Sequence, residues 1–146
     1  MTQLSGEEHF TQAPPVIWSR LIDAEFMARC MPQLESVEAD DSAFLVCRVR
    51  PGLVFLKGTI RASFDSYDMQ PPDSLRMRIH SKGIGSSAIV ETAIALSVLD
   101  GGTQLAWTAD IVELGGLLKP VTRGLLEAAA RKIIGEGWTQ FKEELG

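Results

Sequence analysis

Few residues in this 146-residue chain have both the type and the spacing that chemistry needs. A hydrolase or transferase uses a nucleophile beside a base, or two carboxylates in one cleft. Ser86 and Ser87 are adjacent hydroxyl candidates, but they stand in GIGSS without a nearby histidine. A nucleophile elbow requires a helix after the serine, and no helix is predicted after Ser86 and Ser87. The sequence therefore offers no nucleophile for covalent catalysis.

Proton abstraction by a carboxylate is the remaining catalytic option. In TQLAWTADIVE, continuing the inward register from Leu105 through Ile111 places Glu113 inward at the end of a strand. Glu8 is inward on the same count. A carboxyl group in an apolar cavity has a raised pKa and can act as a general base. The commoner alternative is a strand-end carboxylate exposed to solvent, so the sequence leaves both interpretations of Glu113 open.

Metal and redox chemistry have little support in the sequence. The two histidines, His9 and His80, are far apart, and no CxxC or HExxH pattern lies near them. We expect His80 on a solvated strand face. The chain has two cysteines, Cys30 and Cys47. Two cysteines in a chain without an export signal are typically reduced thiols. We predict no metal and no cofactor.

The composition is that of one globular domain, which we expect to span residues 1–146. Hydrophobic residues make up 45% of the chain and charged residues 23%, the balance of a chain that buries its own core. The net charge is −5 and no basic stripe is present, so we expect no nucleic acid partner. MTQLSGEEHF lacks the basic start and the apolar run typical of a signal peptide, and no segment approaches the ~20 apolar residues of a membrane span. We expect a cytoplasmic protein with at most peripheral contact to the inner face of the membrane.

The alternation of polar and apolar residues predicts a strand, two short helices, about six strands and a long helix. The first strand ends at APP (13–15), and two short helices follow before Pro32. From residue 34 to 113 the pattern alternates between turn signals, which is typical of antiparallel strands with one buried face. The last helix is expected to begin near Leu114, with Pro120 in its first turn.

A long antiparallel sheet whose one large helix comes last must bury that helix in its curve, because each element has an apolar face to cover. We therefore predict an α+β helix-grip fold, with a curved antiparallel sheet of about seven strands around a long C-terminal helix. Such a sheet can leave an internal cavity beside the helix. The candidate ligand-binding residues are the inward strand positions and three residues near the short helices: Met27, Cys30, Met31, Leu56, Ile60, Met77, Ile79, Ser81, Val90, Thr92, Ile94, Trp107, Ala109, Ile111 and Glu113.

The last helix adds candidates from its first half. At 100° per residue its earlier apolar residues gather on one side, whereas those from Ile133 to Leu145 gather nearly opposite. A helix on a membrane surface keeps one continuous apolar stripe, so this change of face argues against that role. The helix residues expected to contact a ligand are Leu117, Leu118, Val121 and Leu125.

The order and spacing of these features resemble a known family. FTQAPPVIWSRLIDAEFMARCMPQLESVE is similar to the opening of the CoxG-like family of carbon monoxide dehydrogenase subunits, within the START-like (SRPBCC) superfamily. The later stretches LKGTIRASF, KGIGSSAIVETAIALSVLDGGTQLAW and LGGLLKPVTRGLLEAAARKIIGEGWTQF resemble that family as well, so the similarity covers nearly the whole chain. In the opening, the residues at matching places are Phe10, Pro14, Trp18, Leu21, Asp23, Cys30 and Pro32.

The resemblance implies a helix-grip fold with a deep hydrophobic cavity that carries or presents an apolar ligand, such as a lipid or an isoprenoid quinone. The resemblance also implies that some relatives act together with a molybdenum hydroxylase that oxidises carbon monoxide, and that they recruit this enzyme to the membrane. The chain departs from the family at Pro32-Gln33, where the family has Pro-Gly, and at Pro51-Gly52, which reverses a Gly-Pro turn. Longer relatives continue into a linker and a membrane segment beyond the position of Gly146.

We expect binding rather than catalysis, with a lipid- or quinone-like molecule in the cavity and an accessory role to a molybdenum hydroxylase. Two alternatives stay open. One is an enzyme resembling polyketide cyclases and aromatases, and the other is a ligand-free module that docks on a partner oxidoreductase. The sequence predicts neither the ligand nor the oligomeric state, so a dimer also stays open.

Overall fold

The computed structural model describes residues 2–41, 44–53 and 57–146, and it confirms the predicted order of elements. One strand and two short helices come first, followed by six strands and a long helix. The elements are β1 (Thr2–Phe10), α1 (Pro14–Leu21), α2 (Ala24–Arg29), β2 (Leu34–Asp41), β3 (Phe44–Val49), β4 (Ile60–Gln70), β5 (Ser74–Gly83), β6 (Ser86–Leu99), β7 (Gly102–Gly116) and α3 (Arg123–Leu145).

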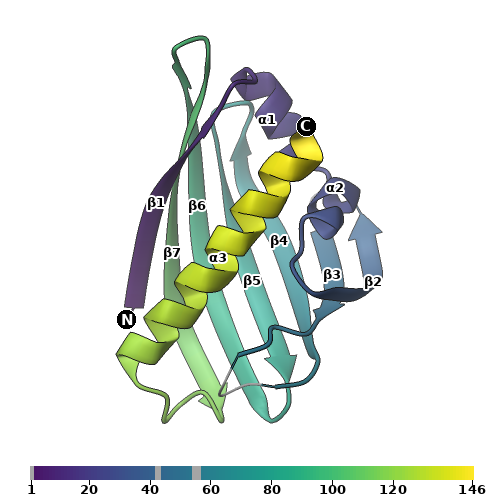
Figure 1. Cartoon of the computed structure of the whole chain (residues 1–146), viewed down its shortest axis with the longest axis vertical. Coiled ribbons are helices and arrows are strands. Elements are labelled where there is room, and N and C mark those ends of the chain that lie inside the picture. Colours follow the sequence, from purple (N-terminus) through teal and green to yellow (C-terminus); the bar gives the residue numbers. More distant parts are fainter. Residues whose placement is uncertain (1, 42–43, 54–56) are drawn as a thin grey trace.

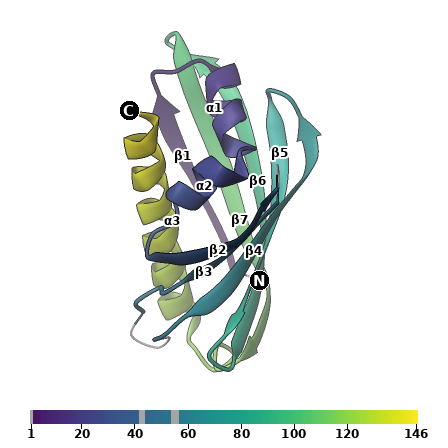
Figure 2. The same ribbon diagram turned by 90° about the vertical axis from the view of Figure 1, so that its right-hand side faces the viewer.

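The strands form one antiparallel sheet in the order β1-β7-β6-β5-β4-β3-β2. Strands β2 to β7 are joined as a meander, and β1 pairs with the last of them. The sheet curves, and α3 crosses its concave side diagonally (Figure 1). Turned by 90°, the molecule shows α1 and α2 beside one end of α3, on the same side of the sheet (Figure 2). The predicted α+β helix-grip architecture is confirmed.

The long helix begins later than the sequence pattern predicts, at Arg123 rather than near Leu114. Residues up to Gly116 complete β7, because Gly116 still pairs with Ser86 on the full length of β6. Pro120 lies in the turn that follows, since a residue before proline is disfavoured in the α conformation. The helix starts where the Thr122 hydroxyl accepts a hydrogen bond from the backbone N–H of Leu125, at 3.4 Å.

Most of the earlier apolar residues that suggested a change of apolar face precede Arg123 and are not helical. Within α3 one stripe of apolar side chains packs against the core, whereas Leu125 and Ile133 are 50% and 39% exposed. This stripe is not free to face a bilayer, because the core covers it. Its members are Ala130, Ile134, Trp138, Phe141 and Leu145.

A second difference concerns LVFLKGTIRASFDSY, which lies within the stretch from residue 34 to 113 that alternation predicts as strands. Strand β4 begins at Ile60, and Lys57 to Thr59 precede it as irregular backbone. Gly58 adopts a φ of +117°, which a residue with a side chain rarely takes, so the strand pattern cannot continue through it. The candidate Leu56 lies outside the described residues.

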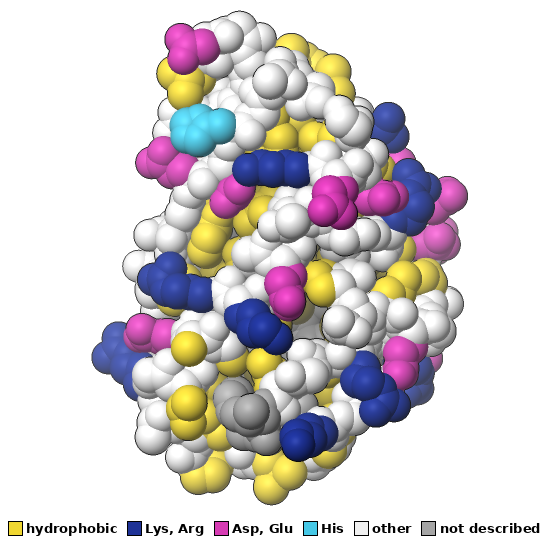
Figure 3. Space-filling view, in the orientation of Figure 1, with side chains coloured by type: hydrophobic (Ala, Val, Ile, Leu, Met, Phe, Trp, Pro, Cys, Tyr) yellow, Lys and Arg dark blue, Asp and Glu magenta, His cyan; other side chains and the backbone are white. Residues whose placement is uncertain are grey.

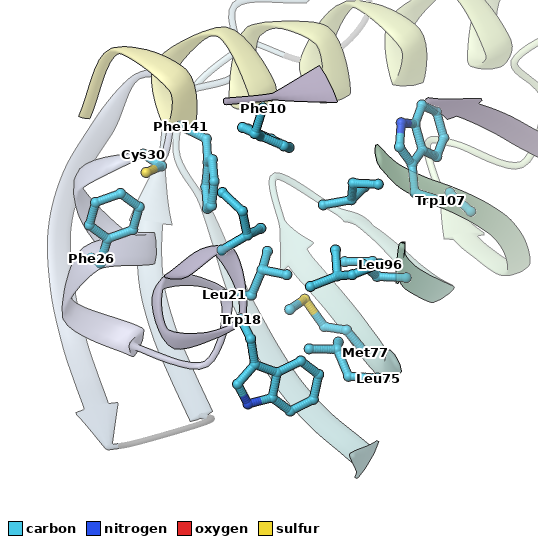
Figure 4. Close-up of a cluster of buried hydrophobic side chains, with 14 of the residues drawn as sticks. Phe10, Trp18, Leu21, Phe26, Cys30, Leu75, Met77, Leu96, Trp107 and Phe141 are labelled. Atoms are coloured by element: carbon cyan, nitrogen blue, oxygen red, sulfur yellow. The ribbon is translucent and has the colours of Figure 1, made fainter. Parts of the chain in front are cut away.

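Aromatic side chains fix the C-terminal end of α3. The Phe141 ring is fully buried and meets the rings of Phe10, Phe26 and Trp138 edge to face, with centroids 5.6, 5.3 and 5.5 Å away. Such pairs are worth about 0.5–1.5 kcal/mol each beyond their buried area. Phe10 belongs to β1 and Phe26 to α2, so this cluster joins the helix to both ends of the N-terminal segment (Figure 4).

The glycines provide a test of this packing. A Cβ atom at Gly135 of α3 would meet nothing within 4 Å, whereas one at Gly6 of β1 would lie 2.6 Å from the Trp107 ring. We expect Gly135→Ala to raise the free energy of unfolding by about 0.5–1 kcal/mol, because alanine is the better helix former. Gly6→Ala should lower it by about 1–3 kcal/mol through overpacking. Urea denaturation measures both, and a destabilising Gly135→Ala would contradict the described helix surface.

Candidate functional site

Two adjoining internal spaces lie between α3 and the concave side of the sheet. We name the larger one, of about 250 Å³, the aliphatic lobe and the smaller one, of about 180 Å³, the aromatic lobe. The aromatic lobe is bounded by Trp107, Trp138 and Phe141. Seven residues line both lobes, which makes them neighbours: Met31, Pro32, Phe64, Ile79, Thr92, Ile133 and Ile134.

The lobes reach the surface between α3 and the segments that follow α2 and β3. Gln33 and Pro51 line the aliphatic lobe from those segments, and Gln33 is exposed. From the helix, Ile133 lines both lobes although 39% of its surface is exposed, and the exposed Glu136 lies one turn further along. A side opening between helix and loops is therefore a way in for a small molecule.

Small residues create the space. Ala109 on β7 and Ala130 on α3 line the aliphatic lobe from opposite sides. Gly137 lines the aromatic lobe, and a Cβ atom added to it would meet nothing within 4 Å. Larger residues at these positions would fill the gap, so the lobes exist because helix and sheet both present small residues there.

Polar groups on the walls are few. Thr92, on both walls, donates its hydroxyl hydrogen to the backbone carbonyl of Met77 at 2.7 Å and is thereby satisfied. The half-buried Ser81 lies on the aliphatic wall. Glu136 is the one charged residue among the described lining residues, and it lies at the exposed opening. Such a site suits a neutral, mostly apolar molecule.

Most of the candidates chosen from the sequence do lie on these walls. The inward alternation on β4 to β7 and the residues near α2 are brought together under the helix. They are Met27, Cys30, Met31, Ile60, Met77, Ile79, Ser81, Val90, Thr92, Ile94, Trp107, Ala109 and Ile111.

The four candidates from residues 117–125 do not lie there. Leu117 and Leu125 are 58% and 50% exposed, and they precede or open the helix rather than cover the sheet. Leu118 is buried but packs with Leu53 and Val121 in a separate cluster at the other end of the sheet. Their placement on the cavity wall was wrong because it rested on a helix starting near Leu114.

Glu113 also lies outside the cavity. The β6–β7 register shifts between Ile89 and Val90, so that Val90 opposes Ile111 whereas Ile89 opposes Glu113. Val112 is the extra residue of a β-bulge, which turns the following side chain to the other face. Glu113 is exposed there. The predicted inward register thus ends at Ile111, and the bulge is the physical reason.

Glu8, the other carboxylate counted as inward, points toward α3 but is neutralised. Its Oε1 lies 2.9 Å from Nζ of Lys142. Both partners are partly exposed, with 22% of the Glu8 side chain and 44% of the Lys142 side chain accessible. Neither carboxylate is therefore an unpaired base inside the cavity.

Sequence reasoning missed the second half of α3 and the loops at the opening. The apolar positions Ile133, Ile134 and Trp138 were visible as a helix face, but the earlier apolar run was preferred as the ligand face. Phe64 continues the spacing of the inward candidates Leu56 and Ile60 and could have been chosen. Loop residues such as Gln33 carry no periodic signal, so the pattern could not have found them.

A model of the CoxG family, described as a subunit of carbon monoxide dehydrogenase, matches residues 6–146. The chain belongs to the CoxG family. This membership suggests an accessory role related to carbon monoxide dehydrogenase. No curated protein matches the chain.

Solved structures of similar fold come from several bacteria. A conserved protein from Geobacillus kaustophilus is 22% identical, with a TM-score of 0.87 over 98% of this chain and 94% of that one. A protein from Arthrobacter aurescens is 12% identical, with a TM-score of 0.72 over 98% and 85%. One from Chromobacterium violaceum is 11% identical, with a TM-score of 0.69 over 97% and 95%. At these identities the similarity shows the fold alone.

Charged residues of this CoxG-family protein form ion pairs outside the cavity. On β6, Glu91 accepts a hydrogen bond from the Tyr67 hydroxyl at 2.6 Å and also pairs with Arg78. The Tyr67 hydrogen bond, with the arginine, holds the pKa of Glu91 below its usual range. Over the side that carries α3, charges of both signs are interspersed with hydrophobic side chains rather than gathered into a basic field (Figure 3).

Two further properties hold for the described residues. No three or more His, Cys, Asp or Glu side chains among them are placed to hold a metal ion. In the same part of the chain, no helix has the length and apolar character needed to cross a membrane.

Both cysteines are free thiols, as expected from the sequence, and both are buried. Burial raises the pKa of the Cys30 thiol to about 12, with a smaller contribution from Glu144. Burial likewise raises the pKa of Cys47 to about 11. Cys30 lines the aromatic lobe, whereas Cys47 packs between α2 and the sheet. A thiol held protonated is a weak nucleophile, so Cys30 serves as an apolar wall.

These thiols predict a pH dependence of stability. Above the ordinary thiol pKa, near 9, the unfolded chain loses protons that the folded chain keeps, so the free energy of unfolding falls as pH rises toward 11. Urea denaturation at several pH values from about 8 to about 11 measures how steeply the free energy of unfolding falls with pH. Replacing both residues, Cys30→Ala with Cys47→Ala, should flatten this slope relative to the unsubstituted protein. Equal slopes would contradict the raised pKa values.

Proposed function

We propose that this protein binds an apolar, lipid- or quinone-like small molecule between α3 and the sheet, and carries it as an accessory to a molybdenum hydroxylase of carbon monoxide dehydrogenase type. The observation that carries the proposal is the pair of adjoining apolar lobes of about 250 and 180 Å³ under the helix. The two spaces together come within the range of roughly 300–1,000 Å³ that small-molecule sites occupy.

The energetics of the lobes support an occupant. Water that enters an apolar space finds few hydrogen-bond partners there, so an apolar molecule is the more favourable occupant. Such a molecule gains contacts with the walls and binds the folded state alone. Occupancy should therefore stabilise the fold, and the exposed opening beside Ile133 gives the molecule a way in and out.

The partner in this proposal comes from the family. An accessory of a membrane-associated oxidoreductase that handles an apolar molecule would work in the cytoplasm, at or near the inner face of the membrane. A ligand-carrying role unites the apolar site with that accessory role. The alternative function, a module that docks on a partner without binding a ligand, does not account for the two apolar lobes.

The cyclase-like alternative finds no supporting observation among the described residues. Its candidate base, Glu113, faces away from the cavity, and Glu8 is paired with Lys142. The one charged residue on the described walls, Glu136, lies at the opening and is exposed.

Filling the space tests the function. Ala109 is 1% exposed and faces the aliphatic lobe from β7. We expect Ala109→Trp to abolish uptake of N-phenyl-1-naphthylamine, a neutral apolar fluorophore, with little change in the free energy of unfolding, because the new ring occupies open space. Fluorescence titration measures uptake and urea denaturation measures stability.

The matched control is Ala106→Trp, which adds the same ring to the exposed face of the same strand. It should leave uptake unchanged. A loss of about 1–3 kcal/mol or more from Ala109→Trp would show overpacking of a filled core and contradict the proposal. Unchanged uptake of the fluorophore by Ala109→Trp would also contradict the proposal.

A further inference from the structure

Trp107 carries a buried hydrogen-bond donor without a partner. Its side chain rises from the middle of β7, is 9% exposed and lines the aromatic lobe. Among the buried side-chain nitrogen and oxygen atoms of the described residues, Trp107 Nε1 is the one that has no hydrogen-bond partner. Buried polar groups in proteins are nearly always paired, so an orphaned N–H inside a cavity indicates a missing acceptor.

The backbone opposite the ring holds it in place. Gly6 of β1 pairs with Trp107, and a Cβ atom there would fall 2.6 Å from Cζ2 and 2.9 Å from Nε1. Glycine therefore lets the indole lie against β1 within the aromatic lobe. The indole nitrogen lies on the ring edge turned toward the middle of the side-chain cluster (Figure 4).

The described groups around this donor offer it no acceptor. The hydroxyl of Thr92, on the same wall, is already engaged with the Met77 carbonyl. The other described residues of the aromatic lobe contribute hydrocarbon, thioether and thiol groups or a second indole, and none of them is a lysine or arginine. Indole N–H is a donor only, so its partner must be an acceptor. An ionised acceptor would be buried without a countercharge, which is strongly unfavourable.

We infer that Trp107 is a specificity-determining residue whose Nε1–H binds a neutral carbonyl oxygen of the ligand in the aromatic lobe. The apolar remainder of the ligand then extends into the aliphatic lobe toward the opening. The inference rests on the proposed function and adds to it the chemical class of the ligand: an uncharged, carbonyl-bearing apolar molecule. A hydrocarbon of the same shape leaves the donor unpaired, and a fatty-acid carboxylate lacks a countercharge.

Two probes of matched shape test this. The ketone 2-acetylnaphthalene and the alkene 2-isopropenylnaphthalene differ in having an oxygen or a methylene group. Their dissociation constants are measured on the unsubstituted protein and on Trp107→Phe, which keeps an aromatic ring but loses the N–H. The preference for ketone over alkene should fall by roughly fivefold to tenfold in Trp107→Phe, the value of one neutral hydrogen bond.

Trp138→Phe is the matched control, because it removes an indole from the same lobe. It should keep the ketone preference of the unsubstituted protein. Trp107→Phe could instead bind both probes with the same preference for ketone over alkene as the unsubstituted protein. That result would overturn this inference and leave the cavity-binding function standing. If neither probe binds the unsubstituted protein, both proposals fail.

A spectroscopic readout covers the case in which Trp107→Phe does not fold. In the ¹H–¹⁵N spectrum of the unsubstituted protein, the Trp107 indole signal is assigned from its neighbours along the lobe. The ketone should move this signal downfield by formation of the hydrogen bond, whereas the alkene should not. Identical shifts with the two probes would overturn the inference without any variant.

Discussion

The packing of the α3 stripe against the concave side of the sheet is the contact on which the rest of the structure depends. At the C-terminal end of the helix the contact is tight, since Phe141 is enclosed by Phe10, Phe26 and Trp138. Ion pairs from Lys142 to Glu8 and from Arg29 to Glu144 lie beside it. Further along, the facing residues are small, and helix and sheet cannot close. A cavity follows from a helix anchored by large side chains at one end and facing small ones in its middle.

The β-bulge at Val112 keeps that cavity apolar. Without it, the alternation of β7 would continue inward through Glu113 and place a carboxylate against the helix. With it, the carboxylate faces solvent and Leu114 returns to an apolar cluster with Leu118. Bulges are local devices for redirecting a side chain. Here the consequence is a site suited to holding a neutral molecule rather than to moving protons.

The fold was predictable because it depends on long, regular patterns, whereas the orphaned nitrogen of Trp107 was not. Alternation over β5 and β6 placed Met77 and Val90 on the inner face, and the order of elements left one arrangement for the last helix. The inward placement of Glu113 was wrong because one extra residue, Val112, shifts the register of β7. A pattern counted at fixed spacing cannot detect a single extra residue. Trp107 was placed inward, but its missing partner is a three-dimensional property that depends on Gly6 across β1.

Native mass spectrometry can detect whether the space under α3 holds, or can take up, a small molecule. The freshly purified protein is sprayed from volatile buffer before and after incubation with a total lipid extract of bacterial membranes. We expect a one-to-one non-covalent adduct of an uncharged apolar molecule, present at purification or gained from the extract. The bare protein mass alone, both before and after incubation, would contradict this expectation.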